Sequence, residues 1–387
     1  MAVVRRYIAA VVLCLTLWHT AMAQIRVGAE RTECYLPSLR GKRVAVLANH
    51  TAVVRGEHLV DMLVREGINP VGIVSPEHGF RGTADAGEKV SSGVDERTGI
   101  QIWSLYSSRG RHLTSEQCEQ FDVMLIDMQD VGLRFYTYYI TMLDVMADCA
   151  TAGRKVIILD RPNPNGMYCD GPTLDMRYKS GVGALPIPVV HGLTMGEIAM
   201  MAIGEGWAPQ CDVEVVRCEE YTHASRYTLP IAPSPNLRSQ HAIYLYPSTC
   251  LFEGTVCSLG RGTEHPFECY GHPQMKNCTF SFTPRSTAGA KRPPLMDALC
   301  YGVDLRKAND EDIIAAGFSL EYVIDAYHRV GLPTEKFFTP FFEKLVGVAY
   351  IREMIANGCS ASEIRARWQP SLDEYRVLRR KYLLYEE

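Results

Sequence analysis

The chain has 387 residues, of which 47% are hydrophobic and 22% charged, with a formal net charge of −4 at neutral pH. This composition is typical of a globular protein with one large domain or two medium ones. Because there is no basic excess, we expect no nucleic-acid partner.

The N-terminus has the pattern of an export signal. Arg5 and Arg6 precede an apolar run over residues 7–18, and Ala21-Met22-Ala23 follows as a small-residue cleavage site. The run is too short to span a bilayer, and no later stretch is long and apolar enough. We therefore expect residues 1–23 to be a cleaved signal peptide, and the mature protein to be periplasmic or secreted without a membrane span.

Twelve of the thirteen cysteines lie in the expected mature chain. An even number in an exported protein permits disulfides, and Cys211/Cys218 and Cys269/Cys278 are the local pairs to consider first. The sequence has no Cys-x-x-Cys pair, which argues against a zinc knuckle or a thioredoxin-like site.

Apolar runs and helical spacings alternate in the first half of the chain. Residues 43–48 and 71–74 are apolar runs of strand length, and residues 58–66 between them carry apolar side chains at helical spacing. A strand, a helix and a strand within about thirty residues form a βαβ unit, which implies a parallel sheet with a right-handed crossover. Further strands are predicted at residues 100–105, 121–126, 155–159 and 185–190. The pattern predicts an α/β fold with a doubly wound, mostly parallel sheet.

Two helices of this region have recognisable ends. A helix over residues 138–151 is followed by Gly153, a typical C-terminal glycine. Thr194 and Glu197 have the spacing of a capping box, so Glu197 has a structural explanation and is not a site candidate.

The composition changes after a proline-rich connector at residues 230–235, and we expect residues 24–235 and 236–387 to form two domains. The second is predicted to be a smaller α+β domain. Its predicted strands are residues 279–283 and 301–305; its predicted helices are residues 319–330 and 361–368 and the tail 373–385; its predicted irregular stretches are residues 244–247, 249–252 and 258–263.

Polar residues follow the predicted strands at the points where they end. In a doubly wound sheet these ends meet on one rim, where ligands bind. The residues concerned are Asn49, Glu77, His78, Asp127, Asp130, Asp160, Arg161, Asn163, Asn165 and His191. From the second domain, a stretch containing Glu253, Arg261 and Glu268 is expected to close the cleft. Carboxylates that cap loop backbone are the competing, structural interpretation.

Several reaction classes lack their sequence signature. There is no Gly-x-Gly-x-x-Gly after the first strand and no Gly-x-x-x-x-Gly-Lys loop, so we expect no nucleotide cofactor. A metal site built from His50, His78, Asp127, Asp130 and His191 is disfavoured because no two histidines are closely spaced on one helix. A serine hydrolase is disfavoured because no Gly-x-Ser-x-Gly elbow is present.

Carboxylates, neutral hydrogen-bonding side chains, arginines and aromatic residues together suit a sugar ligand. Carboxylates can protonate a leaving oxygen or stabilise an oxocarbenium ion. Arginine can bind a carboxylate of the substrate through its two-pronged fork.

Long motifs spread over nearly all of the mature chain resemble the bacterial exo-β-N-acetylmuramidase family. They are Ser-Pro-Glu-His-Gly-Phe-Arg-Gly at 75–82, Asp-Met-Gln-Asp-Val-Gly-Leu-Arg-Phe-Tyr-Thr-Tyr at 127–138, Leu-Asp-Arg-Pro-Asn-Pro-Asn-Gly at 159–166, Pro-Ile-Pro-Val-Val-His-Gly-Leu-Thr at 186–194, Pro-Ser-Pro-Asn at 233–236, Cys-Leu-Phe-Glu-Gly-Thr at 250–255, Gly-Arg-Gly-Thr at 260–263 and Lys-Tyr-Leu-Leu-Tyr at 381–385.

The resemblance implies a Rossmann-like N-terminal domain, a smaller C-terminal domain and a site in the cleft between them. It implies hydrolysis of the terminal, non-reducing, β-1,4-linked N-acetylmuramic acid of peptidoglycan fragments, with a peptidoglycan-derived oligosaccharide as partner and no cofactor. One departure stands out, because the chain has Asp170-Gly171-Pro172 where the family pattern leads us to expect Glu-Gly-Pro.

The resemblance also implies roles for single residues. Glu77 is the expected general acid, and His78 is expected to orient it. Asp127, Asp130 or Glu253 is the partner carboxylate, unless the 2-acetamido group of the substrate attacks the anomeric carbon itself. One of Arg81, Arg134, Arg161 and Arg261 is expected to hold the lactyl carboxylate, with buried ion pairs to Asp127 or Asp160 as the competing explanation. The remaining substrate-binding candidates are Asn49, Tyr136, Asp160, Asn163, Asn165, His191 and Glu268.

Two other functions stay open. An exported protein that binds cell-wall sugars without turnover would bind muramoyl compounds and release no sugar. An amidase or esterase acting on wall peptides would give other products, and the scarcity of nucleophiles at the strand ends disfavours it.

Overall fold

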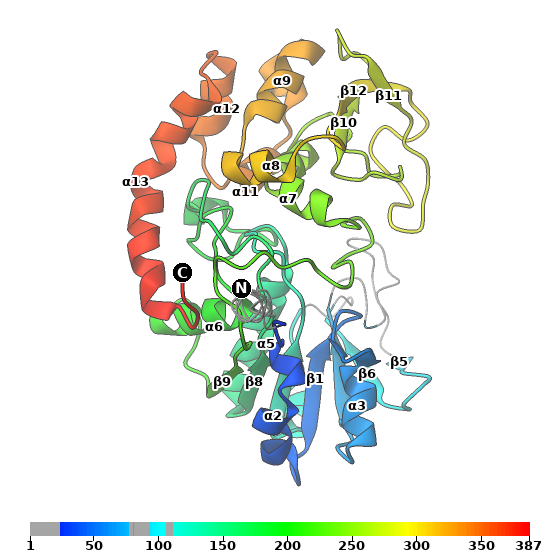
Figure 1. The fold of residues 1–387 in the computed structure, drawn as a ribbon, viewed down its shortest axis with the longest axis vertical. Helices are drawn as coiled ribbons and strands as arrows, with labels where there is room; N and C mark the ends of the chain where they lie inside the picture. Colours follow the sequence, from blue (N-terminus) through cyan, green and yellow to red (C-terminus); the bar gives the residue numbers. More distant parts are fainter. Residues whose placement is uncertain (1–23, 77–79, 81–92, 106–110) are drawn as a thin grey trace, which may run out of the picture.

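A computed structural model describes residues 24–76, 80, 93–105 and 111–387 of the chain (Figure 1). Within these ranges, no helix combines the length and the apolarity that crossing a bilayer requires.

The described part of the chain contains a seven-stranded sheet with the order β5-β6-β4-β1-β7-β8-β9. Its strands are β1 (Val44–Ala48), β4 (Gly72–Ser75), β5 (Gly93–Val94), β6 (Gln101–Ser104), β7 (Val123–Asp127), β8 (Lys155–Leu159) and β9 (Val213–Val216). All neighbouring pairs are parallel except β5 with β6. From β1 the chain proceeds outward through β4 to β6, and then from β7 outward through β8 to β9. This is the doubly wound order that the sequence predicts, with its switch point between β1 and β7.

Helices pack on both faces of this sheet. Alternate residues of β1 point to opposite faces, so that Ala45 and Leu47 join one core, and Val44 and Val46 the other. The first face is covered by α4 (Ser115–Glu119), α5 (Tyr138–Ala152) and α6 (Met195–Gly204); the second by α2 (Thr32–Leu39) and α3 (Leu59–Arg65). The smaller elements of this part are η1 (Gly28–Glu30), η2 (Met176–Tyr178) and the hairpin β2 (Val53–Val54) with β3 (Glu57–His58).

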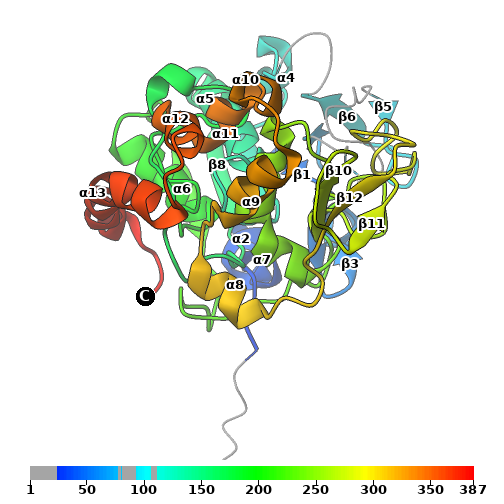
Figure 2. The ribbon, with the colours of Figure 1, turned by 90° about the horizontal axis from the view of Figure 1, so that it is seen from above.

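The C-terminal part of the chain lies over the carboxyl ends of the strands (Figure 1). A small antiparallel sheet of order β10-β12-β11 occupies one side of it, and the long helix α13 the other (Figures 1 and 2). Its elements are α7 (Gln240–Thr249), η3 (Cys250–Gly254), β10 (Cys269–His272), β11 (Phe280–Phe282), β12 (Cys300–Asp304), α8 (Asp310–Ala316), α9 (Glu321–Val330), α10 (Thr334–Phe337), α11 (Phe341–Val346), α12 (Tyr350–Ala356), α13 (Ala361–Arg379) and η4 (Arg380–Tyr382).

The structure corrects one predicted strand. Residues 185–190 are irregular and make only isolated bridges, in which Val190 pairs with Leu133 and with Asp170. Pro186 and Pro188 supply no backbone N–H, so this apolar run cannot form a ladder. The outer parallel strand on this side is β9, whose partly exposed side chains gave a weak signal.

Two predictions for the C-terminal part were also wrong. The stretch around residues 244–252, expected to be irregular, forms α7 and η3, with Pro247 inside α7. The predicted helix 361–368 and most of the tail form one helix, α13, which runs through Pro370. Pro370 lies on the exposed face, where water can meet the carbonyl that loses its helical partner.

The twelve cysteines of the described ranges are all unpaired. The local pairs Cys211/Cys218 and Cys269/Cys278 are therefore not disulfides. Most of these thiols are buried and contribute to the core as small apolar side chains.

Candidate active site

The polar residues that follow β1 and β7 meet at the switch point of the sheet. The Thr51 hydroxyl donates to Asn49 Oδ1 at 2.6 Å and accepts from the Gln129 backbone N–H at 3.1 Å. Asn49 is fully buried, and its Nδ2 has no partner among the described residues. The predicted convergence of the strand ends is thus present.

Asp127 and Arg161 form a buried ion pair across the ends of β7 and β8. Arg161 Nε and Nη2 donate to the two carboxylate oxygens of Asp127 at 2.5 and 2.8 Å. Asp127 is fully buried and Arg161 nearly so. Each charge of this pair is met by the other, so the structure favours the structural explanation for both residues.

Asp130 and His191 lie together but are incompletely partnered. Asp130 Oδ1 accepts from the Gly132 N–H at 2.6 Å, and His191 Nε2 lies 3.9 Å from the same oxygen. Among the described residues, neither Asp130 Oδ2 nor His191 Nε2 has a hydrogen-bond partner. Burial raises the pKa of Asp130 to about 7 and lowers the pKa of His191 to about 3. At neutral pH the histidine is neutral, and the carboxyl can give or take a proton.

Asp160 stabilises the start of α6. Its carboxylate accepts from the Thr194 hydroxyl, the Gly196 N–H and the Tyr385 hydroxyl at 2.7, 2.9 and 2.7 Å. It is fully buried, and burial raises its pKa to about 6.

The two asparagines that follow are engaged with loop backbone. Asn163 Nδ2 donates to the Leu193 carbonyl at 2.9 Å, and its Oδ1 accepts from the Asn165 N–H at 2.8 Å. Asn165 Nδ2 donates to the Val131 carbonyl at 2.9 Å. Both side chains therefore hold the loops of the rim in place.

Arg134 is not placed to bind a substrate carboxylate. It is fully buried, and its guanidinium donates to the carbonyls of Pro172, Ile187 and Leu345 at 2.7, 2.9 and 2.8 Å. Its role is to join two loops of the N-terminal part to the end of α11.

Asp170, where the chain departs from the family pattern, anchors the two parts of the molecule to each other. Its carboxylate accepts from the Phe318 N–H at 2.9 Å and from Arg365 at 2.6 Å, with Trp368 Nε1 at 3.4 Å. The carboxylate is nearly buried, which favours a structural role over a catalytic one.

A pocket of about 120 Å³ lies where the N-terminal part, the connector and the C-terminal part meet. Tyr136, Glu253 and Arg261, three of the predicted site residues, line it. The other lining residues are Phe135, Thr137, Tyr138, Val182, Ser234, Asn236, Leu237, Tyr246 and Phe267. Five of the twelve are aromatic, which suits packing against the faces of a sugar ring.

Arg261 is held at this pocket by two neighbours. Its Nε and Nη2 donate to Glu253 Oε1 at 3.0 and 2.6 Å, and its guanidinium lies 5.0 Å from the centre of the Phe267 ring. Within the described part of the chain, no hydrogen bond engages Arg261 Nη1. About one fifth of the side chain is exposed. Arg261 can therefore offer a donor to a ligand while Glu253 fixes its orientation.

Glu268 does not line the pocket. It accepts a hydrogen bond from the hydroxyl of Ser239, the N-cap residue of α7, and lies 3.4 Å from His265 Nδ1. These contacts indicate a structural role at the start of α7.

A second cavity, of about 1090 Å³, is lined by Pro230 and Ile231 of the connector. Arg161 and Thr51 line it from the rim, together with Val53 and Arg55 of the hairpin and the stretch from Glu220 to Ile231. The connector thus contributes residues both to the small aromatic pocket and to this wider cavity.

Glu77, His78 and Arg81 lie outside the described residues. The strand that precedes them, β4, ends at Ser75 beside β1. Phe80 is buried and packs its ring against His58 at 4.7 Å. The described neighbours of Glu77 thus belong to the carboxyl-end rim of the sheet.

Some residues of the pocket were missed from the sequence. Tyr246 and Asn236 belong to no catalytic or binding pattern in the sequence, although Asn236 is the last residue of the Pro-Ser-Pro-Asn motif.

Across the described ranges, no three His, Cys, Asp or Glu side chains are grouped to hold a metal ion.

Two family models cover most of the chain. The model described as "Exo-beta-N-acetylmuramidase NamZ, N-terminal" matches residues 44–241, and its C-terminal counterpart matches residues 244–385. A curated relative from Bacillus subtilis (strain 168), named peptidoglycan beta-N-acetylmuramidase NamZ, is 34% identical over 91% of this chain and 89% of its own length.

Solved structures show the same fold. A DUF1343 family protein from Bacteroides fragilis NCTC 9343 superposes with a TM-score of 0.88 at 51% identity, over 94% of this chain and all of its own. A second DUF1343 family protein from the same organism superposes with a TM-score of 0.76 at 27% identity, over 94% of this chain and 99% of its own. With both family models matched and a relative of 34% identity, the chain belongs to the exo-β-N-acetylmuramidase NamZ family.

Proposed function

We propose that the protein is an exo-acting glycoside hydrolase that releases terminal, non-reducing N-acetylmuramic acid from peptidoglycan fragments during cell-wall turnover. Membership of the NamZ family carries this proposal, and the aromatic, arginine-containing pocket between the two parts of the molecule supports it.

Glu77 is the proposed general acid that protonates the glycosidic oxygen. It stands two residues beyond the end of β4, in a sheet whose carboxyl ends form the rim, as the family motif implies. A positioned acid contributes about 10² to 10⁴ in rate, so Glu77 is expected to dominate the chemistry.

The choice of a partner carboxylate narrows to Asp130 and Glu253. Asp127 is excluded in this proposal because both its oxygens bind Arg161. Asp130 keeps one carboxylate oxygen without a partner among the described residues, and Glu253 lines the pocket. The substrate's own acetamido group stays the alternative nucleophile.

Arg261 is the proposed ligand of the lactyl carboxylate, which distinguishes muramic acid from glucosamine. Of the candidate arginines in the described ranges, Arg134 is fully buried among backbone carbonyls and Arg161 pairs with Asp127 at the wider cavity, whereas Arg261 lines the aromatic pocket. A charged hydrogen bond to a carboxylate is worth about 1.5–3 kcal/mol, enough for strong discrimination between the two sugars.

The reaction is tested with the disaccharide N-acetylmuramyl-β-1,4-N-acetylglucosamine and with the disaccharide of reversed order. Mass spectrometry is expected to show free N-acetylmuramic acid from the first substrate only. Tight binding of the first disaccharide without any released sugar would instead establish the binding-protein alternative, and products from wall peptides alone would establish an amidase or esterase.

Export is part of the proposal. Residues 1–23 carry the charge, apolar run and cleavage site of a signal peptide. The mass of the protein recovered from the periplasm or medium is expected to fit a chain that begins at Gln24. Recovery of the uncut chain from the cytoplasm would contradict this.

A further inference from the structure

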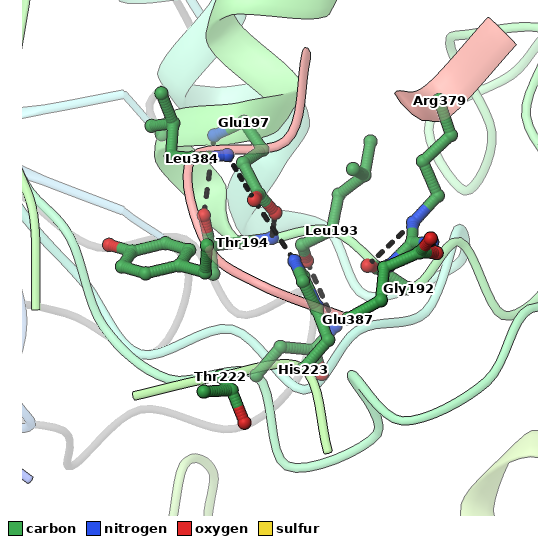
Figure 3. Close-up of polar contacts among 12 residues, drawn as sticks. Gly192, Leu193, Thr194, Glu197, Thr222, His223, Arg379, Leu384 and Glu387 are labelled. Atoms are coloured by element: carbon green, nitrogen blue, oxygen red, sulfur yellow. Dashed lines mark hydrogen bonds and ion pairs between the residues drawn. The ribbon is translucent and has the colours of Figure 1, made fainter. Parts of the chain in front are cut away.

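The last four residues of the chain, Leu384 to Glu387, return from the C-terminal part to the α/β part; we call them the C-terminal segment. The Leu384 N–H donates to Glu197 Oε1 at 2.8 Å, and the Glu386 carbonyl accepts from the His223 N–H at 2.7 Å. Figure 3 shows this segment lying against the start of α6, with Glu197 pointing toward Leu384 and His223. The segment is thus bound to the α/β part by backbone as well as side chains.

Tyr385 is the residue of this segment that reaches the rim. Its hydroxyl donates to Asp160 Oδ2 at 2.7 Å and accepts from the Cys218 N–H at 3.0 Å. The ring is nearly buried and packs edge-on against Tyr221, with ring centres 4.9 Å apart. Two hydrogen bonds and the ring contact give the Tyr385 phenol a single orientation, so it fixes the position of the Asp160 carboxylate.

Asp160 connects this phenol to the candidate site. It follows the last residue of β8, and the next residue, Arg161, forms the buried ion pair with Asp127. The Tyr221 hydroxyl also accepts from the Asn163 N–H at 3.3 Å, so the same aromatic pair supports the loop after Arg161. The C-terminal segment therefore contacts this loop directly at Asp160, and through the ring of Tyr221 it also supports the contact at Asn163.

The C-terminal segment makes no contact with the aromatic pocket, since neither Tyr385 nor its neighbours line it. The Lys-Tyr-Leu-Leu-Tyr motif of the tail nevertheless belongs to the family resemblance. The hydrogen bonds of Tyr385, the last residue of this motif, to Asp160 and Cys218 indicate that it holds the loop after β8.

We propose that Tyr385 is a positioning residue for the hydrolase reaction: by hydrogen-bonding Asp160 it holds Arg161 and Asp127, and with them the carboxyl-end rim, in catalytic register. The inference rests on the proposed function. A small displacement of a rim loop is costly because misplacement by about 1 Å can lower a rate by about 10². The effect is expected in kcat, because the binding contacts of the pocket remain.

The test is the steady-state kinetics of Tyr385→Phe on a chromogenic N-acetylmuramide. This change removes one hydroxyl and keeps the ring packing. We expect kcat to fall about tenfold while KM stays within about twofold of the wild type.

Two matched controls separate positioning from stability. Tyr270→Phe removes an equivalent hydrogen bond, from a buried phenol to Asp325 at 2.7 Å, inside the C-terminal part. Tyr382→Phe removes a hydrogen bond of the same tail, to Glu205 at 2.5 Å, on the side of α6 remote from the rim. Both controls are expected to keep kcat within about twofold of the wild type.

Kinetics of Tyr385→Phe that match those of the two controls would overturn the proposal, and so would a rise in KM at unchanged kcat.

If Tyr385→Phe does not fold, a chain that ends at Tyr385 is measured in its place. That chain loses the Glu386–His223 and Glu387–Arg379 contacts but keeps the phenol, so the proposal expects its kcat to stay within about twofold of the wild type. A tenfold fall in kcat there would show that contacts other than the phenol position the rim, and would overturn the proposal. An inactive wild type would refute the proposed function itself, which keeps the two failures distinct.

Discussion

At the scale of single residues, hydrogen-bond partners divide the predicted site residues into two groups. Asp127 and Asp160 bind protein groups through both carboxylate oxygens, whereas Asp130 keeps its Oδ2 without a partner in the described ranges. The sequence shows which charged residues follow a strand but not which carbonyls they meet. The three carbonyls that bind Arg134 belong to residues 172, 187 and 345, so only the fold reveals its role.

Capping, by contrast, could be predicted, because its partners are local. The Thr194 hydroxyl accepts from the Glu197 N–H, and Glu197 accepts from the Thr194 N–H, as their spacing implies. The aromatic composition of the pocket was also foreseeable in part, from Phe135, Tyr136 and Phe267.

Replacing Arg261 by Gln is expected to remove the preference for muramic acid. The kcat/KM for a chromogenic N-acetylmuramide should fall by about 10 to 10², the loss of one charged hydrogen bond, with little change for the N-acetylglucosaminide. Arg306→Gln is the matched control, since Arg306 also pairs with a carboxylate, Asp304, and lies over a phenylalanine ring. An equal loss of kcat/KM for the two sugars would show that Arg261 does not bind the lactyl group.

Replacing Asp130 by Asn is expected to flatten the pH dependence of stability. Because the pKa of Asp130 is raised to about 7 by burial, its contribution is fully present below the unfolded pKa of about 3.9 and is lost as the pH rises through about 7. Between pH 4 and 7 the wild type should lose on the order of 1 kcal/mol per pH unit relative to Asp130→Asn. Urea unfolding at several pH values measures this, and parallel curves for the two proteins would contradict it.

At the scale of secondary-structure elements, continuous apolar runs predicted the buried strands well. β1, β4, β7 and β8 lie where these runs are, because a central parallel strand is buried on both faces. Proline caused errors in both directions. Pro186 and Pro188 keep residues 185–190 out of the sheet. Pro370, in contrast, does not end α13, because the buried residues of this helix, such as Trp368 and Tyr375, lie on both sides of it in the sequence.

The contact between Asp170 and α13 provides a test at this scale. Asp170→Ala leaves Arg365 and the Phe318 N–H without their acceptor, and we expect a loss of about 2–4 kcal/mol in the free energy of unfolding. Asp373→Ala on the exposed face of the same helix, where Asp373 pairs with Arg376, is expected to cost no more than about 1 kcal/mol. Equal losses in urea unfolding would show that Asp170 does not anchor α13.

At the scale of the whole molecule, the doubly wound architecture follows from the alternation of strands and helices, and the strand order agrees with it. The arrangement of the C-terminal part did not follow from pattern alone. Apart from α13 its helices have ten residues or fewer, and their buried apolar residues belong to the same continuous core as those of the α/β part. The residues themselves predicted that the stretch with Glu253 and Arg261 would close a cleft, but the aromatic side chains that line the pocket with them follow from the fold.

We propose Glu77 as the general acid of the reaction and the aromatic pocket with Arg261 as the site that recognises muramic acid. The most direct measurement compares wild type and Glu77→Gln on a chromogenic N-acetylmuramide and its N-acetylglucosamine analogue. We predict turnover of the muramide only, reduced by at least about 10² in Glu77→Gln. Undiminished muramide turnover by Glu77→Gln, or equal turnover of the two sugars by the wild type, would contradict the account.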